Sequence, residues 1–433
     1  MINMKIGIDC RTILNTKGGE LAGVGHYTYF LVKNLLSLDK ENQYVLFFDN
    51  KFKNFKEFEQ DNVTVRKFPF YQYKKYLPIV YSQMLIGSFL NREKLDLLHC
   101  PANVIPLFYN GATILTVHDL AIYKYPEFFP KKFLSRQIFS TKILVPKSLI
   151  KASKIIAVSK STKSDIIENF GIPEEKIEVI YEGLDPHGIA KSAHADFDKI
   201  KLKYGISGNY FLYVGTIEPR KNLVRLIKAF RNLLMTYDSS AKDFQLILAG
   251  AKGWSDKEVY ATIANANASI LGVDKKRSGE ERRSGLDARN EEQRKREGER
   301  RKFVERRQHN PVKYLGYVTS EEKYALIKNA FTFVFPSLYE GFGLPVLEAL
   351  GMNVPVISSN ISSMPELVGK ECGILINPES ESEITDALNQ MITDDGLREM
   401  FRTNCRERVK DMDWATCAKE TLEAYLSIKK NKK

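Results

Sequence analysis

Residues 331–351 read FTFVFPSLYEGFGLPVLEALG and combine three local signals in one short stretch. The apolar run that opens it predicts a buried strand. The last eight residues predict a helix, because Pro345 suits the first helical turn. Gly341 and Gly343 lie between the two and allow the backbone to turn sharply. The stretch therefore predicts a strand, a glycine loop and a helix, which is the repeating unit of a parallel sheet.

Two glutamates stand eight residues apart in this unit. Glu340 comes just past the predicted strand, and Glu348 falls early in the predicted helix. Ligands of open parallel sheets collect beyond the carboxyl ends of the strands. The amino terminus of a helix also attracts phosphate. We expect the two carboxylates to contact different parts of one long ligand that carries phosphate and hydroxyl groups, such as a nucleoside diphosphate sugar.

Short β-branched runs alternate with amphipathic stretches along most of the chain, which is typical of a doubly wound parallel sheet. We expect one α/β domain over residues 1–190 and a second over 205–410, with the functional cleft between them. Ser159 is placed to cap a helix over 160–170, and Gly171 to end it. The predicted strands are 5–9, 112–119, 154–159, 178–185, 210–215, 244–250, 312–318, 331–337, 354–359 and 373–378.

The composition is that of a globular chain with a positive charge. Its 433 residues are 43% hydrophobic and carry a formal charge of +12, which suits nucleic acid, a membrane surface or anionic substrates. Residues 274–307 hold 14 Lys and Arg against 9 Asp and Glu and are nearly free of apolar residues. They predict a charged low-complexity insertion, favoured as a solvated loop over a phosphate or lipid contact. Nucleic acid is disfavoured because Phe303 is the insertion's only aromatic residue.

Targeting and cysteine signals favour a cytoplasmic protein. The amino terminus passes directly into a strand pattern, so we expect no signal peptide. The apolar stretch 76–90 is too short and too polar for a membrane span. The basic and aromatic stretch 67–78 has the composition of a membrane-interfacial surface, which leaves peripheral contact with the inner face of a membrane open beside an ordinary core or surface role. Five single cysteines predict reduced, packed thiols: Cys10, Cys100, Cys372, Cys405 and Cys417.

Cations are expected beside the carboxylates. Gly215 follows the predicted strand 210–215, and Arg220 and Lys221 come shortly afterwards, with Asn222 placed to cap the next helix. Arg offers a forked pair of hydrogen bonds and Lys a mobile point charge. Both would stabilise the negative charge on a departing diphosphate. We therefore expect no metal ion and no cofactor in that step.

His118, at the end of the strand over 112–119, is the candidate from the first domain, where it would bond a sugar hydroxyl or a phosphate. A hydrogen-bonded structural histidine is the alternative, and Asp119 is favoured as structural. Gly23 and Gly25 form an early GVG loop, which an ordinary turn also explains. The DMD at 411–413 is favoured as a helix-capping turn over a metal-binding motif.

Together these motifs resemble family 4 of the retaining nucleotide-sugar glycosyltransferases, which have the two-Rossmann GT-B fold. The run from Glu340 to Glu348 is similar to the family's E-x7-E signature, and the Arg220 and Lys221 pair, TVHD, GVG and AVSKSTKSDI occur in the expected order. The resemblance covers nearly the whole chain apart from the insertion. It implies that residues 411–433 comprise a helix that crosses back to the first domain and a basic tail.

The resemblance also implies roles for single residues. Glu340 would contact the donor sugar, Glu348 the ribose, and Arg220 and Lys221 the distal phosphate, with His118 near the sugar. It implies retention of the anomeric configuration by a front-face route, without an assigned enzyme nucleophile. Gly23 and Gly25 would border both the donor diphosphate and the acceptor. The full set of remaining residues implied to contact the donor is Gly23, Gly25, Gly215, Gly341, Phe342, Gly343 and Leu344.

The leading hypothesis is transfer of a hexose from a nucleoside diphosphate sugar, GDP-mannose or a UDP-sugar, to a hydroxyl of a glycan or lipid-linked acceptor, without a metal. One alternative is a nucleotide-sugar epimerase of the same architecture. Another is a polyanion-binding protein that uses the basic insertion. The sequence leaves the nucleotide, the sugar, the acceptor, the linkage, the oligomeric state and the role of the insertion open.

Overall fold

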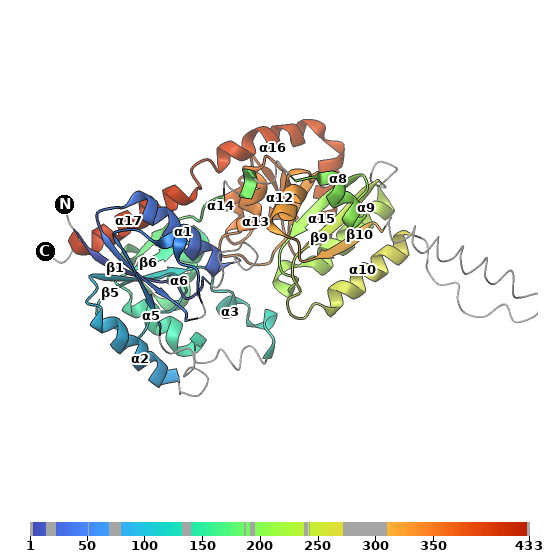
Figure 1. Cartoon of the computed structure of the whole chain (residues 1–433). Coiled ribbons are helices and arrows are strands. Elements are labelled where there is room, and N and C mark those ends of the chain that lie inside the picture. Colours follow the sequence, from blue (N-terminus) through green and yellow to red (C-terminus); the bar gives the residue numbers. More distant parts are fainter. Residues whose placement is uncertain are drawn as a thin grey trace, which may run out of the picture.

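A computed structural model of the chain places two α/β lobes side by side, with the last two helices running back from the second lobe to the first (Figure 1). The predicted insertion 274–307 lies outside the described residues, as does most of the basic and aromatic stretch 67–78. The structure describes residues 3–13, 23–50, 52–68, 79–131, 140–185, 188–190, 195–237, 241, 243–271 and 310–430.

The first lobe is built on a seven-stranded parallel sheet with the order β3-β2-β1-β4-β5-β6-β7. The order reverses between β1 and β4, and this is the type of place where open α/β sheets bind ligands. The predicted strands at 5–9, 112–119 and 154–159 correspond to β1, β5 and β6, whereas the predicted strand 178–185 overlaps β7 only at its beginning. The strands are β1 (Lys5–Asp9), β2 (Gln43–Phe48), β3 (Val63–Lys67), β4 (Leu97–Cys100), β5 (Ala112–Val117), β6 (Lys154–Ala157) and β7 (Ile177–Val179).

The second lobe has a six-stranded parallel sheet with the order β10-β9-β8-β11-β12-β13. Its reversal lies between β8 and β11, the two strands that lead into the predicted site. Two doubly wound sheets confirm the predicted fold class. The strands are β8 (Asn209–Val214), β9 (Phe244–Ala249), β10 (Val312–Gly316), β11 (Thr332–Phe335), β12 (Val356–Ser359) and β13 (Gly373–Ile376).

Helices cover both faces of each sheet. In the first lobe, α2 and α5 contribute Leu90 and Leu149 to one apolar core, whereas α1 contributes Leu31 to the core on the other face. The helices of this lobe are α1 (Val24–Leu38), α2 (Ile79–Arg92), α3 (Ala121–Lys124), α5 (Val145–Lys151) and α6 (Lys160–Phe170). The others are α8 (Phe197–Tyr204), α9 (Leu223–Thr236), α10 (Lys257–Ile270), α12 (Ser320–Lys328), α13 (Leu344–Gly351), α14 (Met364–Val368), α15 (Glu381–Thr393), α16 (Asp395–Arg408) and α17 (Trp414–Lys430).

The helix ends largely follow the expected capping chemistry. The Ser159 side chain accepts from the Thr162 amide at 3.0 Å, and Gly171 ends α6 at a φ of 61°. Asn222 differs from the prediction, because it precedes α9 at a φ of 60° but makes no side-chain cap. Its side-chain amide instead donates to the carbonyls of Pro336 and Pro378, at 3.1 and 2.6 Å. These bonds connect the segment after β8 to the segments that follow β11 and β13.

The terminal helix α17 crosses back to the first lobe, as the resemblance implies. The Trp414 ring stacks on Phe30 of α1 with centroids 5.5 Å apart, and the Tyr425 hydroxyl lies 2.6 Å from His99 Nδ1 of β4. Asp413 caps the helix by accepting from the Thr416 amide at 2.8 Å, which confirms the capping interpretation of DMD. The helix therefore fastens the second lobe to the core of the first.

All five cysteines are buried and unpaired, as predicted. Across the described parts of the chain, no helix has the length and apolar character needed to cross a membrane.

Candidate active site

The opening stretch folds as its pattern predicts. β11 ends at Phe335, a loop carries Glu340, and α13 begins at Leu344 with Pro345 in its first turn. Gly343 precedes the helix at a φ of 111°, a conformation that favours glycine. The loop therefore places Glu340 at the carboxyl end of the second sheet, facing the first lobe.

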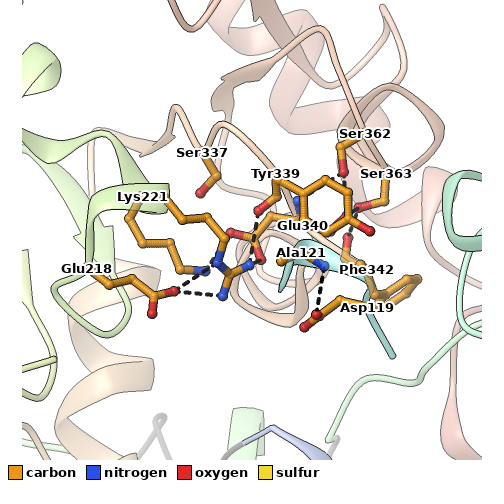
Figure 2. Close-up of polar contacts among 12 residues, drawn as sticks. Asp119, Ala121, Glu218, Lys221, Ser337, Tyr339, Glu340, Phe342, Ser362 and Ser363 are labelled. Atoms are coloured by element: carbon orange, nitrogen blue, oxygen red, sulfur yellow. Dashed lines mark hydrogen bonds and ion pairs between the residues drawn. The ribbon is translucent and has the colours of Figure 1, made fainter. Parts of the chain in front are cut away.

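Glu340 forms a buried ion cluster with the two predicted cations (Figure 2). Its carboxylate lies 3.0 Å from Arg220 NH1 and 2.5 Å from Lys221 Nζ. Both cations sit in the short helix η5 (Pro219–Lys221), which follows β8. The neighbouring strands β8 and β11 thus bring together residues that are 119 and 120 positions apart in sequence.

The cluster contains a second acid that the sequence reasoning missed. Glu218 Oε1 lies 2.7 Å from Arg220 NH2 and 3.0 Å from Arg220 Nε, so Arg220 is held between two carboxylates. Arg220 NH1 also donates to the Tyr339 carbonyl at 3.0 Å. These bonds fix the guanidinium plane while 16% of its side chain stays exposed. A ligand can therefore reach a cation whose orientation is already set.

The electrostatics of the cluster follow from burial and proximity. Burial acts to raise the pKa of Glu340, but the charges of Arg220 and Lys221 outweigh it, so its pKa is lowered. Burial, together with the charge of Arg220, lowers the pKa of Lys221 although Glu340 opposes this. Glu340 is thus held as a carboxylate beside two cations, which suits contact with hydroxyl groups and with an anionic leaving group.

Two serines outside the predicted set hold the backbone of Glu340. Its amide donates to Ser362 Oγ at 2.9 Å, and its carbonyl accepts from Ser363 Oγ at 3.1 Å. Ser363 also donates to the Phe342 carbonyl at 2.8 Å. Figure 2 shows both serines beside the loop. They lie 21 to 23 residues further along the chain, so no local pattern indicates them.

Glu348 lies in a different set of contacts. Its Oε1 is 2.6 Å from Lys323 Nζ and 3.0 Å from the Tyr324 hydroxyl, both from α12. Burial lowers the pKa of His26 of α1, in the first lobe, and the charge of Glu348 opposes this effect. The structure therefore brings Glu340, Arg220 and Lys221 together directly and places Glu348 in a neighbouring group.

His118 is held within the first lobe. Its Nδ1 lies 3.1 Å from Glu182 Oε1, and its Nε2 lies 2.9 Å from the Pro101 carbonyl. Both partners can accept a hydrogen bond, and the tautomer of the ring decides which nitrogen donates. The ring also meets Tyr27 edge-on, with centroids 4.7 Å apart. These contacts fit the structural alternative for His118, and its contact with a ligand stays a prediction.

The residues on both sides of Glu340 form hydrogen bonds with the first lobe. The Tyr339 hydroxyl donates to Asp165 Oδ2 at 2.7 Å and accepts from the Leu120 amide at 3.2 Å. Thr162 Oγ1 donates to the Gly341 carbonyl at 3.2 Å. A Cβ on Gly341 would lie 1.7 Å from the His118 carbonyl oxygen, so only glycine permits this approach. The position of Glu340 therefore depends on contact between the lobes.

The remaining predicted contacts lie around this loop and at the start of α1. Gly23 precedes α1 at a φ of 57°, and Gly25 is in its first turn. Gly215 follows β8 and donates to the Ala249 carbonyl at 2.9 Å. Phe342 is buried and lies near the Tyr181 ring, and Leu344 opens α13. Within the described ranges, no group of three or more His, Cys, Asp or Glu residues could hold a metal ion.

Comparison with known proteins identifies the class and then the family. The structure resembles HepE of Anabaena in complex with UDP and glucose, with a TM-score of 0.63 and 19% identity over 98% of this chain and 100% of that one. The two lobes thus have the GT-B fold. The family described as "Glycosyl transferases group 1" matches residues 196–408, and "Glycosyltransferase Family 4" matches residues 21–187.

Relatives of known name agree with this assignment. O-antigen chain mannosyltransferase B of Escherichia coli is 31% identical over 313 residues, which are 72% of this chain and 69% of that protein. The serotype-specific mannosyltransferase WbdA of Escherichia coli is 23% identical over 77% of this chain and 35% of that protein. The chain belongs to the group 1, family 4 glycosyltransferases. It is therefore a glycosyltransferase enzyme.

Proposed function

We propose that the enzyme transfers a hexose from a nucleoside diphosphate sugar to a hydroxyl of a glycan or lipid-linked acceptor, with retention and without a metal ion. The observation that carries this proposal is the ion cluster at the carboxyl ends of β8 and β11. There, Glu340 lies within 3.0 Å of both Arg220 and Lys221. A carboxylate suits the hydroxyls of a sugar, and the two cations suit its diphosphate.

The chemistry needs a group that stabilises the departing diphosphate. In transfer, the bond from the anomeric carbon to the phosphate oxygen breaks and a bond to the acceptor oxygen forms. Negative charge then grows on the diphosphate, where Arg220 and Lys221 would meet it. A front-face route gives retention, because the leaving phosphate oxygen accepts the proton of the incoming hydroxyl on the same face of the sugar.

The fixed positions of the groups support this role. Glu218 orients Arg220, and Ser362 and Ser363 hold the Glu340 backbone. Little reorganisation is therefore needed when charge develops in the transition state. In this proposal, Glu348 and its partner Lys323 lie further along the ligand, at the ribose.

Mannose is the sugar that we propose first, with GDP-mannose as its donor. Support comes from the mannosyltransferase names of the Escherichia coli relatives. A UDP-sugar is the second candidate, since HepE binds UDP and glucose in its crystal structure. The first lobe would bind the acceptor, and a lipid-linked acceptor would bring a cytoplasmic enzyme to the inner face of a membrane.

A donor panel tests the proposal. GDP-mannose and UDP-sugars are added in turn, and both thermal shift and release of the nucleoside diphosphate are measured, because a ligand that binds the folded state raises its apparent stability. We expect one donor to raise the melting temperature and to be hydrolysed slowly without an acceptor. Product analysis distinguishes transfer from epimerisation, in which the donor is interconverted intact.

Two variants make the test specific to the site. Arg220→Ala should lower donor turnover by about 10² to 10³-fold, the range found when one transition-state donor is removed. Arg231→Ala is the matched control, since Arg231 lies on α9 and its guanidinium bonds the Asn232 side chain. Full activity in Arg220→Ala would show that the site is assigned wrongly.

A further inference from the structure

Exposed apolar side chains gather on one face of the first lobe, away from the ion cluster. Met84 of α2, Phe108 of the loop after β4, and Ile150 of α5 are exposed by 48%, 44% and 69%. Two hollows of about 400 and 380 Å³ lie here, and Phe108 lines both of them. Single exposed apolar residues are ordinary, whereas exposed apolar residues that gather in one patch are typical of interaction sites.

The loop that presents Phe108 is held firmly on α2. A Cβ on Gly87 would lie 2.6 Å from the Phe108 carbonyl carbon, so the absence of a side chain lets the loop pack directly on the helix. Asn91 donates to the Phe108 carbonyl at 3.0 Å and accepts from the Asn110 amide at 2.9 Å. Gln83 accepts from the Leu107 amide at 3.2 Å.

The other side of the loop is fixed by α5. Lys151 Nζ donates to the Leu107 carbonyl at 3.1 Å, and the Ile105 amide donates to Ser148 Oγ at 2.9 Å. The backbone around Phe108 is thus bonded to both neighbouring helices. Its ring is exposed in a fixed position, not as the tip of a free loop.

The charges at the hollows all have one sign. Arg92 lines the first hollow, and Lys147 and Lys151 line the second, whereas none of the described lining residues is acidic. Arg92 and Lys147 are exposed. Apolar side chains beside Lys and Arg are the composition of a surface that meets lipid headgroups. Protein interfaces, in contrast, are depleted in Lys.

We propose that this face is a docking surface for an anionic lipid bilayer. The Phe108 surface, as we call it, consists of Met84, Arg92, Phe108, Lys147, Ile150 and Lys151. Phe108, Met84 and Ile150 enter the boundary between headgroups and acyl chains, and the exposed cations Arg92 and Lys147 bind lipid phosphates. α2 and α5, which carry most of the surface, lie together on one side of the first sheet (Figure 1).

The consequence for the reaction rests on the proposed function. If the acceptor is lipid-linked, docking through the first lobe holds the acceptor-binding domain at the membrane that contains the acceptor. The second lobe and its donor site stay in water. Docking then raises the local concentration of acceptor without changing the ion cluster.

Vesicle co-sedimentation of the full chain tests the surface. Vesicles of phosphatidylcholine, with and without phosphatidylglycerol, are the probes. We expect the wild type to sediment with the anionic vesicles only, and salt to release it. Each lost cation near the surface should weaken binding about fivefold, so the Arg92→Glu and Lys147→Glu double variant should weaken it by at least about 25-fold.

The apolar part is tested by the Phe108→Ser and Ile150→Ser double variant, for which we expect roughly a tenfold loss of binding. The matched controls lie in the second lobe, where Leu202 is 82% exposed and Lys228 is exposed on α9. Leu202→Ser and Lys228→Glu should sediment like the wild type. Unchanged donor thermal shifts show that every variant remains folded.

The outcomes separate this inference from the proposed function. Failure of the wild type to bind anionic vesicles, or equal binding by surface and control variants, overturns the docking surface. Self-association that Phe108→Ser abolishes, with no vesicle binding, also overturns it and assigns the face to a protein interface. Donor turnover is measured without vesicles. If vesicle binding holds while no donor is turned over, the proposed function fails and the surface stands.

Discussion

Removal of one hydroxyl, in Tyr339→Phe, should uncouple the Glu340 loop from the first lobe. The Tyr339 hydroxyl donates to Asp165 at 2.7 Å and accepts from the Leu120 amide at 3.2 Å. Both partners belong to the first lobe, whereas Tyr339 is adjacent to Glu340 in the second. Phenylalanine keeps the ring and loses only these two bonds. The variant therefore weakens contact between the lobes without opening a cavity.

The expected size follows from what the two bonds join. Asp165 is 1% exposed and still has the ion pair with Lys124, so the lost bond to its carboxylate is worth roughly 1.5 kcal/mol. The buried Leu120 amide is left without its partner, which costs about 1 to 3 kcal/mol more. The closed arrangement thus loses about 3 kcal/mol, and each 1.4 kcal/mol is a factor of ten. We expect donor turnover to fall by about 100-fold.

Steady-state kinetics and thermal unfolding measure this effect together. Tyr210→Phe is the matched control, because the Tyr210 hydroxyl donates to the Leu326 carbonyl at 2.7 Å within the second lobe. It should lower stability by about 1 kcal/mol and leave turnover nearly unchanged. Equal turnover in the two variants would refute the idea that Tyr339 couples the lobes at the site.

Three further predictions concern the same framework. Gly341→Ala should lower turnover, measured by steady-state kinetics, at least tenfold. The added Cβ would lie 1.7 Å from the His118 carbonyl oxygen and would force the lobes apart. Trp414→Ala should lower the free energy of unfolding by about 3 to 5 kcal/mol in urea, since this buried ring stacks on Phe30. Because the pKa of Glu340 is lowered in the folded state, its contribution to stability is present above the unfolded pKa of about 4.3 and is lost as pH falls through the folded pKa. The stability difference between wild type and Glu340→Gln, measured in urea, should therefore shrink below about pH 4.

Each of these has a result that would contradict it. Wild-type kinetics in Gly341→Ala would mean that the lobes need not approach at this point. A loss below about 1 kcal/mol in Trp414→Ala would mean that α17 is not fastened through its first residue. A stability difference that stays constant with pH would mean that Glu340 has the same pKa in the folded and unfolded chain.

The parts of the site that are local in sequence were predictable. Glu340 and the Arg220 and Lys221 pair each lie in the segment that follows a strand, and parallel strands present such segments at one edge of their sheet. Their meeting at 3.0 Å and 2.5 Å is a consequence of β8 pairing with β11. The glycine loop was predictable for the same reason, because Gly341 and Gly343 are local signals of a turn.

The contacts that depend on packing between distant segments were not predictable. Glu348 of α13 contacts Lys323 and Tyr324 of α12. No periodic pattern in the sequence indicates that these two helices pack against each other. The bond of Tyr339 to Asp165 spans 174 residues and both lobes. Local pattern also left out the strands β2, β3 and β4.

The most direct measurement is a crystal structure of the enzyme with a bound nucleoside diphosphate. Our account predicts that the distal phosphate oxygens lie within hydrogen-bonding distance of Arg220 and Lys221, with Glu340 facing the position of the sugar. A nucleotide bound in another place, with the Glu340 ion cluster left unchanged and out of reach, would contradict it.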